Sequence, residues 1–253
     1  MSGSESVDHG TAKLQSIAMK LTESCGGSYS SSLGINLASM DSGEVFKWFV
    51  ASLLLGGGAS DAIATKAYRG LEKLGALSPV GIFKLDEAGV AGVLQRSGYA
   101  KRVIVTAENI MTAVRGLQDR YGGDLNRLHF FAEDEQDLER RLRGLRGIGR
   151  KPAIVFLRGL RGLWDKAEPR PLDDVVLAIG RLGLATGPEA NASLEALQLA
   201  WEATGQDERG FADFEVALAR LGQRYCRKGR CQECPVGTEC QWRPPSNGDE
   251  PTT

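Results

Sequence analysis

Four cysteines near the C-terminus constrain the fold of this chain more than any other feature. Cys226, Cys231, Cys234 and Cys240 fall within fifteen residues, with the spacing C-x4-C-x2-C-x5-C. A hydrophobic core does not require so many thiols in one short segment. Thiolates that are this closely spaced can instead bind one inorganic centre. We therefore expect the segment to fold as a loop around one metal centre.

Three chemical fates compete for these cysteines. The first ten residues, MSGSESVDHG, lack the basic and apolar regions of a secretory signal, so the thiols are expected in a reducing compartment, which disfavours disulfides. A zinc ribbon normally divides its ligands between two Cys-x2-Cys pairs, but only Cys231 and Cys234 form such a pair. A single iron–sulfur cubane accepts four closely spaced thiolates. The isolated Cys25 is expected to be a small buried apolar residue.

Apolar residues recur at helical intervals, and no alternating strand pattern stands out, so the sequence predicts an all-α protein. Serine caps and glycine stops set the boundaries. The expected helices cover residues 45–55, 62–74, 80–83, 85–95, 102–121, 135–142, 152–160, 174–182, 193–204 and 211–222. The longest apolar run, 48–55, is too short to span a bilayer, so no membrane partner is expected. Residues 1–10 and 245–253 are expected to be flexible tails.

Positive charge is concentrated in two segments, although the formal net charge is only −1. Residues 140–170 carry ten Lys or Arg against two acids, and residues 220–230 carry five and no acid. A segregated positive face on a near-neutral protein is typical of proteins that bind a polyanion. An ordinary solvated helix surface, the alternative, mixes both signs. The sequence therefore predicts a nucleic-acid partner.

A glycine-rich turn lies inside the first basic segment. Gly147 and Gly149 flank Ile148 between two expected helices, where glycine permits a positive φ and lets a phosphate approach the backbone. Pro152 suits the first turn of the following helix, whose N–H groups would face the anion. A plain corner between helices, the alternative, needs only one glycine. The expected DNA-binding residues of this turn are Arg146, Gly147, Gly149 and Arg150.

This segment resembles the helix–hairpin–helix of the DNA glycosylases related to endonuclease III, here expected at residues 144–157. In that group Gly-x-Gly-Arg-Lys is followed by an apolar helix and later by an apolar residue and Asp at another helix start, which matches Leu172-Asp173. The group ends with Cys-x6-Cys-x2-Cys-x5-Cys around a [4Fe–4S] cluster, and the last two intervals match. The similarity extends over about residues 44–242.

The resemblance implies a two-lobed helix–hairpin–helix DNA glycosylase fold, with a cleft between a six-helix domain and a cluster-bearing domain. The six-helix domain is expected at residues 44–163. The second domain is expected to combine residues 1–43 with 164–253 and to hold the cluster loop at 226–240. With the family match added, a [4Fe–4S] cluster on the four cysteines is preferred over zinc, which stays the alternative.

The resemblance also places Lys151 where bifunctional members carry their nucleophile. Its amine would attack C1′ of a damaged nucleoside, release the base and form a Schiff base that undergoes β-elimination. The helix N-terminus and Arg150 are expected to lower the pKa of this lysine. Asp173 corresponds to the carboxylate that assists attack and stabilises the oxocarbenium ion. The alternatives are a phosphate-binding Lys151, an N-cap role for Asp173 and Asp174 as the acid.

Further DNA contacts are expected from loops. A glycosylase must extrude the target nucleotide and fill the gap, and Tyr99, which follows Gly98, is a candidate wedge. Core packing of that aromatic ring is an equal alternative. The cluster would fix the loop that carries Arg227, Lys228 and Arg230 onto DNA.

The sequence thus predicts a base-excision repair enzyme, a bifunctional DNA glycosylase with AP lyase activity on oxidised pyrimidines. Its partner would be double-stranded DNA with a damaged base or an abasic site, and it would act as a monomer in the cytoplasm, at the nucleoid in a prokaryote. One alternative is a monofunctional glycosylase or a pure abasic-site lyase. The other is a non-catalytic helix–hairpin–helix DNA-binding protein.

Overall fold

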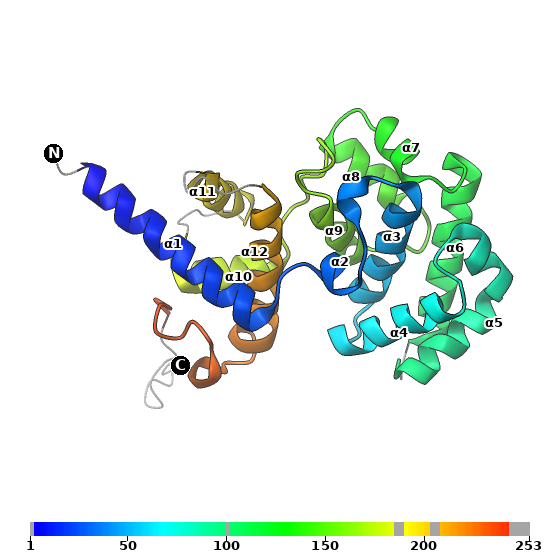
Figure 1. The fold of residues 1–253 in the computed structure, drawn as a ribbon, viewed down its shortest axis with the longest axis horizontal. Coiled ribbons are helices and arrows are strands. Elements are labelled where there is room, and N and C mark those ends of the chain that lie inside the picture. The colour runs from blue at the N-terminus through cyan, green and yellow to red at the C-terminus, as the bar shows by residue number, and fades with distance from the viewer. Residues whose placement is uncertain (1–2, 100–101, 185–189, 203–207, 243–253) are drawn as a thin grey trace, which may run out of the picture. The chain divides into compact units, whose positions relative to one another are not determined.

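A computed structural model describes residues 3–99, 102–184, 190–202 and 208–242. These residues form helices and connecting segments and no strand, which confirms the all-α prediction. The chain divides into two compact units (Figure 1). Unit 1 joins residues 1–28 to 170–253, and unit 2 comprises residues 29–169. None of the described helices combines the length and the apolar character that crossing a membrane requires.

Unit 2 is a succession of helices joined by short turns. Their bounds are α2 Tyr29–Ser32, the 3-10 turn Leu37–Ser39, α3 Ser42–Gly56, α4 Asp61–Lys73, α5 Pro79–Ser97, α6 Val103–Tyr121, α7 Leu125–Phe130, α8 Glu135–Arg143 and α9 Arg150–Gly159. Helix α3 lies at the centre, in contact with α4, α7 and α9. Its residues from Val45 to Leu55 are all buried except Lys47, as expected of a helix that is apolar on every side.

Helices α3 and α9 approach each other closely. The indole Nε1 of Trp48 donates a hydrogen bond to the carbonyl oxygen of Phe156 at 2.9 Å. A Cβ atom on Gly159 would lie 2.5 Å from the same indole ring, so only glycine fits this position. The rings of Phe49 and Phe156 meet edge to face at 5.7 Å between centroids. This contact fixes α9, which carries the candidate site at its N-terminus.

The expected helix caps are present in unit 2. Ser60 accepts a hydrogen bond from a first-turn N–H of α4, and Ser78 does the same for α5 with Pro79 as the first helical residue. Helix α5 is broken at Asp86, which has a φ of 57° and caps the second half by accepting from the Gly89 N–H at 2.8 Å. This break accounts for the two short helices that the sequence predicts in this region.

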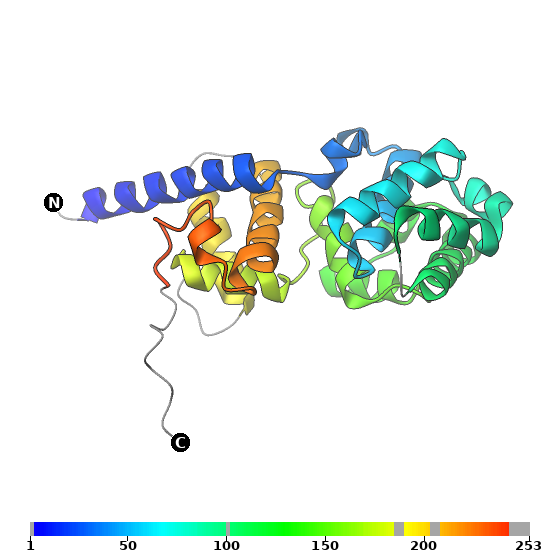
Figure 2. The same ribbon diagram turned by 90° about the horizontal axis from the view of Figure 1, so that it is seen from below.

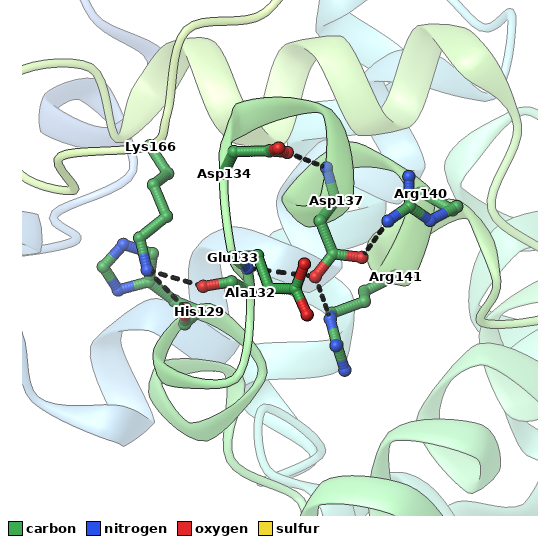
Figure 3. Close-up of polar contacts among 8 residues, drawn as sticks. All are labelled: His129, Ala132, Glu133, Asp134, Asp137, Arg140, Arg141 and Lys166. Carbon is green, nitrogen blue, oxygen red and sulfur yellow. Dashed lines mark hydrogen bonds and ion pairs between the residues drawn. The ribbon is translucent and has the colours of Figure 1, made fainter.

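Buried Asp137 organises the start of α8 (Figure 3). Its carboxylate accepts a hydrogen bond from the Glu133 N–H at 3.0 Å and pairs with Arg141 at 2.6 Å and with Arg140. The guanidinium of Arg141, the largest cause, holds the pKa of this carboxyl below its usual value. Two of the arginines in the first basic segment are therefore neutralised within their own helix.

Lys166 binds the backbone of the segment that joins α7 to α8 (Figure 3). Its ammonium group donates to the carbonyl oxygens of His129 at 3.2 Å and Ala132 at 2.9 Å. The His129 ring stacks on Trp164 at 4.4 Å and bonds to Asp165 at 2.7 Å. Burial lowers the pKa of His129, partly offset by the Asp165 hydrogen bond.

Unit 1 packs its N-terminal helix against the C-terminal part of the chain. Its elements are α1 Gly3–Cys25, α10 Asp173–Leu182, α11 Ala190–Glu202, α12 Glu208–Leu221, the π-helical turn Gly222–Cys226 and the 3-10 turn Cys231–Glu233. Helix α1 packs against α12 and crosses it at a steep angle (Figure 1; Figure 2). The buried guanidinium of Arg220 joins them by donating to the carbonyl oxygens of Cys25, Gly26 and Gly27 at 2.7–3.0 Å.

Helix α1 corrects the prediction of a flexible N-terminal tail. The helix begins at Gly3, so residues 3–10 are helical. Buried Leu14, Ile17 and Leu21 follow a helical spacing and anchor α1 in the core of unit 1, and the helix continues from them toward the N-terminus. Cys25 is 5% exposed in this core, as expected. The predicted tail at residues 245–253 lies outside the described residues.

The boundaries of the units differ from the expected domain limits, 44–163 and the remainder. Unit 2 begins at residue 29, because the segment before α3 packs on that helix. It ends at residue 169, because Trp164 and Lys166 are held by α7. Residues 29–43 and 164–169 thus belong to the unit that carries Lys151.

Candidate functional site

The turn between α8 and α9, residues 144–149, is anchored on the core of unit 2. Leu145 is fully buried and Ile148 is 7% exposed. The Ile148 N–H donates to the Leu145 carbonyl at 3.1 Å, and the Arg120 guanidinium donates to the Gly144 carbonyl at 3.0 Å. Two buried aliphatic side chains and these bonds give the turn a fixed shape.

The two glycines of this turn serve different purposes. Gly147 has a φ of 100°, and a Cβ atom there would lie 2.4 Å from the carbonyl oxygen of Asn109 on α6. Gly149 is extended, with φ −82° and ψ 173°, and is the N-cap of α9. The expected positive φ therefore holds for Gly147 alone. Because Gly149 has no side chain, nothing from the N-cap residue covers the N–H groups of the first turn.

Lys151 occupies the first turn of α9. Arg150 is the first residue of the helix and Lys151 the second. Lys151 is half-buried, while Arg146 and Arg150 are exposed on either side of the turn. A helix N-terminus favours negative charge through its N–H groups and its dipole. The structure thus places two exposed cations and one half-buried cation beside an anion-favouring helix end.

The end of α3 packs directly on this first turn. A Cβ atom on Gly56 would lie 2.5 Å from the nitrogen and Cα of Pro152. Gly56 is the last residue of α3, and the close approach of α3 to α9 requires a glycine at this position. Leu53, Gly56 and Gly57 also border a cavity of about 140 Å³ between α3, α6 and the turn.

The predicted positive face is smaller than the count of basic residues suggests. Arg158 and Arg161 are only 3% and 1% exposed, and Arg161 pairs with Glu168. In the second basic segment Arg220 is buried at 8% exposure. The hydrogen bonds of Arg220 to backbone carbonyls give it a structural role, so its presence in the basic segment needs no DNA contact to explain it. Sequence counting could not separate buried arginines from exposed ones.

Tyr99 lies in the core rather than at a loop tip. It is 5% exposed, and its hydroxyl donates to the Leu54 carbonyl at 2.8 Å. Burial raises the pKa of this phenol well above its usual value. The structure therefore supports the alternative of core packing and not the wedge. Two large apolar side chains on the first turn of α6, Ile104 and Val105, are 64% and 48% exposed.

Asp173 and Asp174 open helix α10 in unit 1. Leu172 is the N-cap, so Asp173 is the first helical residue and does not take the N-cap role considered from the sequence. Asp173 is exposed, whereas Asp174 accepts from the Arg227 guanidinium at 2.7 and 2.8 Å. Asp174 is therefore held in an ion pair with the cysteine loop.

All four C-terminal cysteines line one cavity of about 250 Å³ in unit 1, which the sequence predicts by spacing alone. They are free thiols, with Cys226 buried and the other three half-buried. Burial raises the pKa of Cys226 to about 11, while the nearby Arg181 guanidinium acts in the opposite direction. Among the described residues no three potential metal ligands are gathered at one point. The donor set suits a thiolate-ligated centre by its chemistry, and its loading with metal stays a prediction.

Arg181 ties the cysteine loop to the end of α10. Its guanidinium donates to the Cys226 carbonyl at 2.6 Å and lies 3.8 Å from the ring centroid of Trp242. Its own carbonyl accepts from the N–H groups of Gln241 and Trp242 and from the Cys240 thiol. The helix that begins at Asp173 is thus joined to both ends of the loop.

Three basic residues expected to contact DNA are exposed on this loop: Arg227, Lys228 and Arg230. The pair with Asp174 offsets the charge of Arg227, so Lys228 and Arg230 carry the positive potential there.

The polar lining of the 140 Å³ cavity beside the glycine turn was not predicted from the sequence. Two of its side chains, Thr106 and Asn109, are three residues apart on one face of α6, which is a signal that the sequence does contain, and the third, Arg102, is the N-cap residue of that helix.

No protein-family model matches this chain, and no curated protein matches it either. The likeness to the endonuclease III group therefore depends on the residues quoted from the sequence.

Proposed function

We propose that this protein is a base-excision repair enzyme, a DNA glycosylase with AP lyase activity that acts on oxidised pyrimidines. The observation that carries the proposal is the place of Lys151, in the first turn of a helix that directly follows a glycine turn and is flanked by exposed Arg146 and Arg150. An amine placed beside a backbone site for phosphate can reach the sugar of a bound strand. Its substrate would be double-stranded DNA, bound by a monomer in the cytoplasm.

In the proposed reaction the strand is held by the first-turn N–H groups of α9 and by the two flanking arginines. The neutral amine of Lys151 attacks C1′ of the damaged nucleoside. A C1′–N bond to lysine forms and the glycosidic bond breaks, and the base leaves with its bonding electrons and a proton. Loss of the C2′ proton from the resulting Schiff base then expels the 3′ phosphate. A carboxylate, for which Asp173 is the candidate from the sequence, would stabilise the positive charge that develops on the sugar.

We further propose that Cys226, Cys231, Cys234 and Cys240 hold a [4Fe–4S] cluster. Their placement around one cavity of about 250 Å³ suits a body of several atoms, whereas four sulfurs on one zinc ion would each lie about 2.3 Å from it. The cluster would supply structure, by fixing the loop that presents Lys228 and Arg230. Visible absorption with matched iron and sulfide content supports the cluster, and a colourless protein with one bound zinc contradicts it.

Borohydride trapping tests the activity. The purified protein is incubated with a duplex that contains an abasic site, and borohydride reduces any Schiff base to a stable adduct. We expect an adduct with the wild type, none with Lys151→Ala, and an unchanged amount with Lys84→Ala, an exposed lysine on α5. An unchanged adduct in Lys151→Ala refutes the assigned nucleophile. Tight DNA binding with no adduct identifies a binding module. Base release from a second duplex that carries an oxidised pyrimidine, again with no adduct, identifies a monofunctional glycosylase.

A further inference from the structure

The cavity beside the glycine turn lies wholly within unit 2. It has a volume of about 140 Å³ and is enclosed by the end of α3, the first two turns of α6 and the turn before α9. Its walls combine backbone with a few side chains. The lining residues are Leu53, Gly56, Gly57, Arg102, Thr106, Asn109, Ile110, Gly147, Gly149 and Pro152.

One face of α6 provides the polar side chains of the cavity. Thr106 and Asn109 are three residues apart on the helix and therefore lie on the same face, and Arg102 is the N-cap residue that precedes α6. Arg102 is exposed, Asn109 is half-buried and Thr106 is 6% exposed. A hydroxyl and a carboxamide supply both donors and acceptors. The cavity thus offers a short edge of mixed hydrogen-bonding groups with one cation beside it.

The rest of the lining is apolar or bare backbone. Leu53, Ile110 and Pro152 supply carbon surface, and four glycines supply peptide groups without side chains. A phosphate has no apolar face to bury against such carbon, so a purely anionic ligand would use only part of this lining. A flat heterocycle uses all of it, with its faces on carbon and peptide planes and its polar edge on Thr106 and Asn109.

The volume limits the size of that heterocycle. An engineered protein cavity of about 150 Å³ binds one benzene molecule. A cavity of about 140 Å³ therefore holds a single six-membered ring and is too small for a fused purine. The polar edge distinguishes the ligand from benzene, because unpaired Thr and Asn groups would be costly against a purely apolar ring.

We propose that this cavity binds one pyrimidine base of the DNA, which rests on the proposed function and names the part of the DNA that this pocket selects. Thr106 and Asn109 bond to the polar edge of the ring, and Arg102 neutralises a phosphate beside the entrance. The base comes from one of two sources, the damaged nucleotide itself or its unpaired partner on the other strand. The same ring chemistry serves both, so the position of the base in the duplex must be tested.

Photocrosslinking with 5-iodouracil distinguishes the two sources. One duplex carries iodouracil opposite guanine, as a mismatched target base, and a second carries it opposite a tetrahydrofuran abasic analogue. A third, with iodouracil paired to adenine, is the control. The full-length protein as purified is irradiated with each duplex and digested with trypsin. We expect a crosslink in the peptide 103–115, which contains Thr106 and Asn109.

A crosslink from the first duplex assigns the cavity to the target base, and one from the second assigns it to the partner base. Saturated DNA binding with no crosslink in peptide 103–115 overturns the proposal, as does an equal yield from the fully paired control. If no DNA binds, the pocket and the repair function both fail.

Matched variants test the hydrogen-bonding edge. Thr106→Val and Asn109→Leu keep the size of each side chain and remove its polar groups. Each should lower the crosslink yield on the order of tenfold, as expected for a lost buried hydrogen bond, while circular dichroism stays unchanged. Glu108→Gln, on the exposed face of the same helix, should have no effect.

Equal yields in all three variants contradict the assignment. The borohydride adduct of Lys151 is measured separately, so loss of the pocket and loss of the lyase are distinguishable.

Discussion

Replacing Gly147 by alanine tests whether the turn before α9 has the shape described. The residue has a φ of 100°, and the new Cβ would lie 2.4 Å from the Asn109 carbonyl oxygen. A left-handed conformation costs an L-residue about 1–2 kcal/mol, and forced overpacking about 1–3 kcal/mol. The free energy of unfolding of unit 2 should therefore fall by about 2–5 kcal/mol.

Gly149→Ala is the matched control two residues away. Its backbone is extended, and the nearest heavy atom to the new Cβ would be the Pro152 Cδ at 3.8 Å. The change in stability should stay within about 1 kcal/mol. Urea denaturation measures both free energies, and hydrogen exchange in α6 and α9 locates the effect. Equal losses in the two variants would refute the description of the turn.

Three more perturbations have definite expected results. Gly159→Ala puts a Cβ 2.5 Å from the Trp48 indole and should cost about 1–3 kcal/mol, measured by urea denaturation; an unchanged midpoint contradicts the α3–α9 contact. Burial lowers the pKa of His129 from 6.5, so the unfolded chain binds the proton more readily and stability should rise with pH through the window just below 6.5. His129→Gln should remove that rise, and an unchanged pH profile in this variant assigns it elsewhere. Arg230→Ala should reduce the slope of log Kd for DNA against log salt by about 1, and an unaltered slope argues against the cysteine loop as a DNA contact.

Most helix positions in unit 2 were predictable because their signals are local, whereas the short helices α2 and α7 were not expected. Ser60 and Ser78 precede their helices and cap them, and glycine follows α3, α5 and α6. The cysteine spacing likewise predicted that the four thiols share one site, because residues this close in the sequence are also close in space. These signals need no knowledge of the remainder of the chain.

Features that depend on distant partners were not predictable. The need for glycine at 159 comes from Trp48, more than a hundred residues earlier. The sequence around Tyr99 is compatible with a wedge and equally with core packing, and the choice is decided by the hydrogen bond from its hydroxyl to the Leu54 carbonyl. Arg161 adds to a basic segment in the sequence and is buried beside Glu168 in the structure. In each case the deciding contact joins separate helices or a loop.

The candidate site was partly predictable for the same reason. Gly147, Gly149 and Lys151 are neighbours in sequence, so their turn could be anticipated. The cavity requires α3 and α6 as well, and only their packing on the turn reveals Thr106 and Asn109 as lining residues.

We propose that the amine of Lys151 forms the covalent bond to DNA. Mass spectrometry of the borohydride-trapped complex tests this most directly, because reduction leaves a stable sugar on the attacked nitrogen. We expect a single modified lysine, at position 151, in the digested wild-type adduct. A sugar on Lys166, on any other lysine or on the N-terminal amine would contradict the account.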